Sequence, residues 1–127
     1  MNLLLIDKIG LAVSAREMVF EEQYHFNVDH AYTVEDVREK YAADKYDVVI
    51  VDFSYEPGAE ALTLIEGINP KQRVIVLSDS DAYSEPNGCA YCVEHSNRRR
   101  LKSPVSIMAL ANLVRDFDYT QCAHFHE

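Results

Sequence analysis

Val48-Val49-Ile50-Val51 is an unbroken run of β-branched residues that ends at an acidic residue, Asp52. Two similar apolar runs lie elsewhere in the chain, Leu3–Ile6 before Asp7 and Val74–Leu77 before Ser78. Short continuous apolar runs are typical of strands that are buried on both faces of a sheet. The three runs therefore predict the centre of a parallel sheet covered by helices on both sides.

The segments between these runs have helical patterns of apolar residues. We expect helices over residues 10–24, 33–43, 58–67 and 105–117, with Thr33 as an N-cap and Asp36 at the capping-box spacing. Weaker strands are expected at 26–31 and 98–101. This alternation predicts an α/β fold, a doubly wound, five-stranded parallel sheet with right-handed crossovers. Pro86-Asn87-Gly88 predicts that the fourth helix is shortened or replaced by a loop.

Length and charge limit the classes of function. The 127 residues are expected to form a single domain, 1–127, and the net charge of −9 argues against nucleic-acid binding. Leu3–Ile6 is too short for a membrane span or a signal-peptide core, so we expect a cytoplasmic protein that does not bind membranes. Arg98-Arg99-Arg100 is interpreted as a charged edge strand that resists aggregation, with Arg98 and Arg100 on one face.

Asp7, Asp52 and Ser78 each follow a predicted strand directly. In an open parallel sheet, functional residues gather at the carboxyl ends of the strands. This ordered set of strand-end residues is similar to that of the receiver domain of response regulators. The chain resembles an atypical variant of the chemotaxis-regulator type. The resemblance extends over essentially the whole chain. It implies a flavodoxin-like fold with strand order 2-1-3-4-5.

The same resemblance implies roles for individual residues. Asp52 matches the phospho-acceptor, Asp7 a magnesium contact and Ser78 the switch hydroxyl, while Ser103-Pro104 stands where the family has Lys-Pro. Mg²⁺ would neutralise the charge that develops during phosphoryl transfer. A receiver is a signalling module and not an enzyme acting on small molecules. Its implied partner is a protein, either a kinase or a downstream effector, and a homodimer is a further option.

Two departures bear on this site. Lys8 replaces the second acid of the family's pair, and Lys102 lies one residue before the lysine position, which Ser103 occupies. A shift of one residue on a strand turns a side chain to the opposite face. We hypothesise that the ammonium group of Lys8 lies between Asp7 and Asp52 and replaces both the metal and the missing lysine. Such a site would be locked and not switched by phosphate.

The cysteines suggest a second site. Cys89 and Cys92 have the C-x-x-C spacing of many zinc sites, and the topology is expected to bring Cys122 to the same end of the sheet. His124 is the preferred fourth ligand of this candidate zinc site, with His95 or His126 as alternatives. The alternatives are cysteines without a functional role, or a redox pair formed by Cys89 and Cys92. Two functions thus remain, a signalling module that binds a protein partner and a metal- or redox-responsive module.

Overall fold

The computed structural model describes residues 1–7, 19–53, 57–78, 97–102 and 107–117. Five parallel strands form one sheet in the order β2-β1-β3-β4-β5, as predicted. The strands are β1 (Asn2–Ile6), β2 (Asn27–Ala31), β3 (Val48–Asp52), β4 (Val74–Ser78) and β5 (Arg98–Lys102). The prediction for the fourth helix falls on residues 79–96, outside the described part of the chain.

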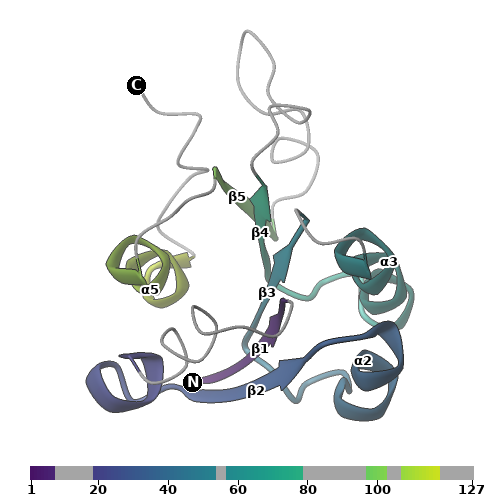
Figure 1. Ribbon diagram of the computed structural model, residues 1–127, viewed down its shortest axis with the longest axis horizontal. Coiled ribbons are helices and arrows are strands. Elements are labelled where there is room, and N and C mark those ends of the chain that lie inside the picture. The colour runs from purple at the N-terminus through teal and green to yellow at the C-terminus, as the bar shows by residue number, and fades with distance from the viewer. Residues whose placement is uncertain (8–18, 54–56, 79–96, 103–106, 118–127) are drawn as a thin grey trace, which may run out of the picture.

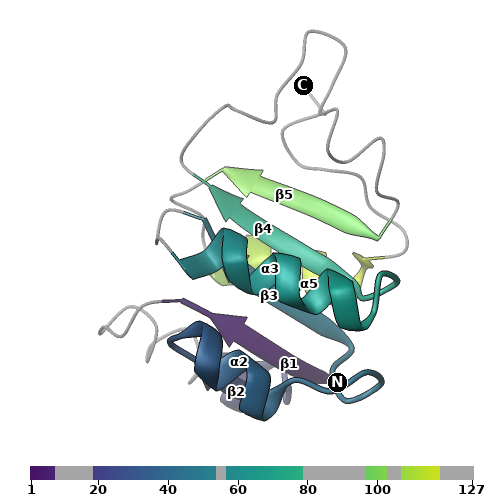
Figure 2. The same cartoon turned by 90° about the vertical axis from the view of Figure 1, so that its right-hand side faces the viewer.

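Helices cover both faces of the sheet (Figure 1). On one face lie α2 (Val34–Lys40) and α3 (Pro57–Ile68), which Figure 2 shows in front of the strands. On the other face lie α5 (Ile107–Arg115) and a short helical segment at 19–23. This two-sided cover explains why the central strands are continuously apolar, because each side chain of such a strand is buried whichever face it points to.

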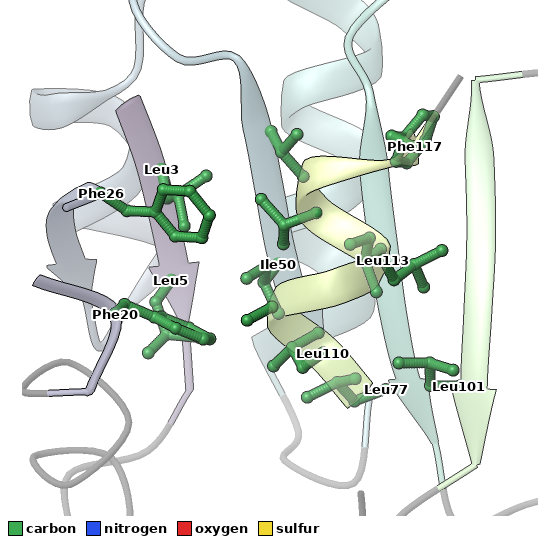
Figure 3. Packing of buried hydrophobic residues seen from close by; sticks show 14 residues of the cluster. Leu3, Leu5, Phe20, Phe26, Ile50, Leu77, Leu101, Leu110, Leu113 and Phe117 are labelled. Carbon is green, nitrogen blue, oxygen red and sulfur yellow. The ribbon is translucent and has the colours of Figure 1, made fainter. Parts of the chain in front are cut away.

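Alternation along the strands divides the core into two clusters. Leu3, Leu5 and Ile50 point toward α5. They form one cluster with Phe20, Phe26, Leu77, Leu101, Leu110, Leu113 and Phe117 (Figure 3). Leu4, Ile6, Val49 and Val51 point toward α2 and α3 and pack on Val37, Ala61 and Ile65. Strands β1, β3 and β4 therefore lie between two apolar layers. Among the described residues, no helix is long and apolar enough to span a bilayer.

Helix α2 begins where the sequence predicts and ends earlier. Thr33 has an extended backbone, and its hydroxyl accepts a hydrogen bond from the Asp36 amide at 3.1 Å. The Asp36 carboxylate accepts in turn from the amide of Tyr32 at 3.0 Å, one residue before the cap. The helix stops at Lys40 instead of residue 43, because Tyr41 is extended and buries its ring against the sheet. Tertiary burial of one side chain therefore sets the helix end.

The segment before β2 turns on a residue in the left-handed region. His25 has φ 58°, and the next amide, of Phe26, donates to the carbonyl of Phe20 at 2.9 Å. This bond closes a turn after the 19–23 helix, and the two phenylalanine rings lie 6.0 Å apart between centroids. The turn leads the chain from the helix into β2.

The position of β5 at the edge of the sheet is confirmed. The interpretation of Arg98 as a surface charge that protects this edge from aggregation is wrong. Its side chain is 1% exposed and forms an ion pair with Glu66 of α3 at 3.4 Å. Arg99 lies on the opposite face, as the alternation predicts, and its guanidinium stacks 4.5 Å from the ring centroid of Phe117. Both arginines fasten the edge strand to the helices that cover it. The Arg100 side chain lies outside the described part of the chain.

Candidate functional site

Two acidic residues meet at the carboxyl ends of adjacent strands. The β1–β3 register pairs Ile6 with Val51, so Asp7 and Asp52 occupy the next position on neighbouring strands. Both residues are buried, with exposed fractions of 4% and 8%. Alternation directs both toward the α5 face, because Leu5 and Ile50, two residues earlier, pack there. Adjacent parallel strands lie about 4.8 Å apart, so the two carboxylates share one small region.

A buried histidine approaches this pair from β2, the strand on the other side of β1. His30 of β2 is 8% exposed, and its Nε2 lies 3.1 Å from the carbonyl oxygen of Asp7. Because a carbonyl only accepts, Nε2 carries the proton and donates this hydrogen bond. Burial lowers the pKa of His30 from its ordinary value of 6.5, so the imidazole is neutral at pH 7. The ring of Tyr32 covers it edge-on, 4.0 Å between centroids.

The first turn of α3 packs directly against the main chain of Asp52. Gly58 is buried there, and a Cβ at this position would collide with the carbonyl oxygen of Asp52. A glycine is therefore needed for α3 to approach the end of β3 so closely. Neither Gly58 nor His30 was predicted from the sequence as a site residue. The available signals were a Pro-Gly pair at the start of a predicted helix and a histidine near the end of a predicted strand.

The other predicted site residues are placed only in part. Ser78 and Lys102 end β4 and β5 and are register partners, so their main chains lie side by side at the same edge as Asp52. Their side chains are outside the described part of the chain, as are Lys8 and Ser103 entirely. The structure thus brings together Asp7 and Asp52, and the roles of all six residues stay predictions.

The predicted zinc ligands also lie outside the described residues. Cys89, Cys92 and His95 fall within 79–96, and Cys122, His124 and His126 within 118–127. Among the described residues, no group of three or more His, Cys, Asp or Glu side chains is arranged to hold a metal ion. The convergence of the cysteines remains a prediction.

The opposite, amino-terminal edge of the sheet carries a network of hydrogen-bonded polar groups centred on the buried side chain of Gln72. Gln72 accepts from the hydroxyl of Tyr41 at 2.7 Å and donates to the carbonyl of Tyr46 at 3.2 Å. The hydroxyl of Tyr46 donates to Asp29 at 2.6 Å. Arg98 donates to the carbonyl of Gln72. Burial raises the pKa of both tyrosines above their ordinary value of 10.0.

Two shallow hollows flank Tyr46 at this edge. One has a volume of about 330 Å³ and is lined by Asp44, Asp47, Asn69, Lys71, Gln72 and Arg73 as well as the tyrosine. The other, of about 230 Å³, is lined by Asn2, Asn27, Asp29 and Lys45. Several of these polar groups already bond within the protein, since Asp47 accepts from the Asn2 amide at 2.7 Å and Asn69 from the Lys71 amide at 3.1 Å. The hollows thus lie beside a hydrogen-bonded structural network.

Neither a protein-family model nor a curated protein matches this sequence. Solved structures do match in fold. A response regulator receiver domain from Clostridium thermocellum is 22% identical, with a TM-score of 0.71 over 92% of this chain and 93% of that one. The receiver domain of a sensor histidine kinase from Pseudomonas aeruginosa PAO1, with magnesium in its active-site cleft, is 14% identical, with a TM-score of 0.71 over 94% and 98%.

A structure described as adenylate cyclase from Rhodopirellula baltica matches equally well. It is 16% identical, with a TM-score of 0.71 over 92% of this chain and 86% of that one. At these identities the similarity establishes the fold and leaves the chemistry to the residues of this chain. The agreement covers strand order, parallel direction and the two helical layers. The chain therefore has the fold of response regulator receiver domains.

Proposed function

We propose that this chain is an atypical receiver module that acts in signal transduction by binding a protein partner, with Asp52 at the phospho-acceptor position. One observation carries the proposal. Asp7 and Asp52 are both buried, on adjacent strands and on one face, at the edge of the sheet where this fold class places its sites. Burying two like charges together is costly, and such arrangements cluster at functional sites.

The two carboxylates fit a divalent cation. Mg²⁺ binds oxygen ligands and often takes only one or two protein carboxylates, with water and phosphate oxygens in the other positions. Asp7 and Asp52 would supply those carboxylates, and the ion would neutralise charge on a phosphoryl group. In this arrangement Asp52 would be the nucleophile. Asp7 would hold the ion beside it.

Lys8 makes the proposed receiver atypical. It follows Asp7 directly, at the position where the family has a second acid. An ammonium group near the two carboxylates would attract them and oppose a divalent cation. We therefore propose that Lys8 holds the acids in a locked pair, so that the module binds its partner without depending on phosphate.

A phosphodonor experiment tests the acceptor assignment and the lock together. The wild-type protein, Asp52→Asn and Lys8→Asp are incubated with Mg²⁺ and a small acyl phosphate, and intact mass is measured. We expect little labelling of the wild-type protein, more in Lys8→Asp, and none when Asp52→Asn is added to Lys8→Asp. Stoichiometric labelling of the wild-type protein at Asp52 would contradict the lock. Absence of labelling in Lys8→Asp would contradict the acceptor assignment.

The partner is proposed to be a kinase or a downstream effector. A signal from a module of one sheet and its covering helices would pass through a bound protein. Binding of a candidate partner that responds to chelator or oxidant, and not to the state of Asp52, would favour the metal- or redox-responsive alternative.

A further inference from the structure

We propose that His30 is a positioning residue for the paired acids. By donating to the carbonyl of Asp7, its imidazole fixes the main chain as it leaves β1 and so keeps Asp7 beside Asp52. This inference deepens the proposed function and depends on it only for the identity of the site. The contact itself, 3.1 Å from Nε2 to the Asp7 oxygen, is a property of the fold.

The first step is the placement of His30. The β1–β2 register pairs it with Leu5, one strand away from the site and on the α5 face, where Val28 also packs. From that position the side chain extends toward the carboxyl edge and meets the main chain two residues beyond its register partner. An apolar residue in the same place would fill the space without bonding to Asp7.

The second step compares the His30 contact with the strand-ladder bond from β2 to the Asp7 backbone. Its amide donates to the carbonyl of Ala31 at 3.4 Å, at the long limit of a hydrogen bond, and β1 ends at Ile6. The His30 contact is shorter and buried, so it is the stronger of these two bonds between β2 and the Asp7 backbone. The position of Asp7 therefore depends on His30 more than on the strand ladder.

The third step is that His30 is itself held in place. The ring of Tyr32 packs on it, and the ammonium group of Lys40 donates to its carbonyl. Tyr32 in turn donates its amide to Asp36, in the first turn of α2. His30 is thus held from both ends of α2, its ring through Tyr32 and its main chain through Lys40, which gives it the rigidity that an orienting group requires.

Native-state hydrogen exchange tests this inference without requiring phosphoryl transfer. The reporter is the Asp7 amide, and the reference is the Ile50 amide in the centre of the sheet. His30→Leu removes the donor and keeps the bulk. His30→Gln keeps an N–H donor near the position of Nε2. Tyr46→Phe is the matched control, since it removes one hydrogen bond to β2, at Asp29, from the far edge.

We expect His30→Leu to speed exchange at Asp7 by about tenfold relative to Ile50, the size that loss of one hydrogen bond gives to a local opening. His30→Gln should return the rate to within about twofold of the wild-type protein. Tyr46→Phe should leave the ratio of the two rates unchanged. Equal acceleration at both amides in His30→Leu, or no rescue by His30→Gln, would overturn the positioning role.

A second readout connects the contact to the site. Because Lys8 is proposed to oppose a divalent cation, Mg²⁺ is titrated into the same variants combined with Lys8→Asp, and binding is followed by the amide shifts of Asp7 and Asp52. Loss of an orienting partner typically lowers metal affinity by about tenfold or more, so His30→Leu should bind correspondingly more weakly than His30→Gln. Equal affinities would contradict a functional role of the contact. A Lys8→Asp protein that binds no Mg²⁺ would count against the proposed metal site, while the exchange ratio would still decide the role of His30.

Discussion

The two edges of the sheet bury polar groups in opposite ways. At the amino-terminal edge, the buried side chains of Gln72, Tyr41 and Tyr46 are neutral, and each makes a named hydrogen bond. The buried guanidinium of Arg98 at the same edge is paired with the carboxylate of Glu66. At the carboxyl edge, Asp7 and Asp52 place two carboxylates together in a buried position. Neutral groups that satisfy each other stabilise a fold, whereas clustered like charge reduces its stability. The first edge therefore supports the fold, and the second is organised for chemistry or binding.

Breaking the amino-terminal network should have the largest effect. Gln72→Leu removes the acceptor of the Tyr41 hydroxyl and the donor to the Tyr46 carbonyl. Leaving these buried groups unpaired should lower the free energy of unfolding by about 3 kcal/mol. Urea denaturation measures the change. Lys71→Ala is the neighbouring exposed control and should stay within about 0.5 kcal/mol of the wild-type protein. A difference below about 1 kcal/mol for Gln72→Leu would show that the network is not a structural support.

The tyrosines of the same edge predict a loss of stability at high pH. Because the folded protein raises the pKa of Tyr46 above 10.0, the unfolded chain releases this proton first as the pH increases. The contribution of Tyr46 to the free energy of unfolding should thus be fully present below pH 10 and be lost above it. We expect a decrease of about 1 kcal/mol at pH 11. Urea denaturation at pH 9 and 11 measures this, and Tyr46→Phe should show a smaller decrease. An identical decrease in the variant would exclude Tyr46 as the source.

The N-cap of α2 lies at the carboxyl edge and should contribute less. Thr33→Ala removes the acceptor of the Asp36 amide and should cost about 0.5–1 kcal/mol, the low end for an exposed cap. Thr63→Ala is the matched control. Its hydroxyl donates to the carbonyl of Ala59 within α3, and alanine is a better helix former, so this change should be neutral or slightly stabilising. Thermal denaturation separates the two, and equal midpoints would contradict the cap.

Neutralising the acceptor position should have the smallest effect on stability. Asp52→Asn keeps the shape of the side chain, removes its repulsion of Asp7 and loses its proposed attraction to Lys8. These contributions oppose each other, so the free energy of unfolding should change by less than about 0.5 kcal/mol. Chemical denaturation of the two proteins provides the test. A loss above about 2 kcal/mol would mean that Asp52 has a structural role like that of Gln72, and the contrast between the edges would fail.

Much of the fold could be predicted because its signals are local. Continuous β-branched runs such as Val48–Val51 mark buried strands, and Thr33 marks a helix start, whatever surrounds them. Helix ends were less predictable: the 33–43 helix stops at Lys40 because Tyr41 finds a buried position against the sheet. Arg98 was misjudged for the same reason, since its burial depends on Glu66 of α3, thirty-two positions earlier in the chain.

The sequence by itself determined the parallel α/β architecture and the acidic residues at the strand ends, because periodicity and strand-end position are local properties of the chain. Only the tertiary structure decided which polar groups are buried together. His30 reaches Asp7 because β2 pairs with β1, and Gln72 reaches Tyr41 and Arg98 because the strands assemble in the order β2-β1-β3-β4-β5. These contacts join residues more than twenty positions apart, and their energies depend on burial that no local pattern encodes.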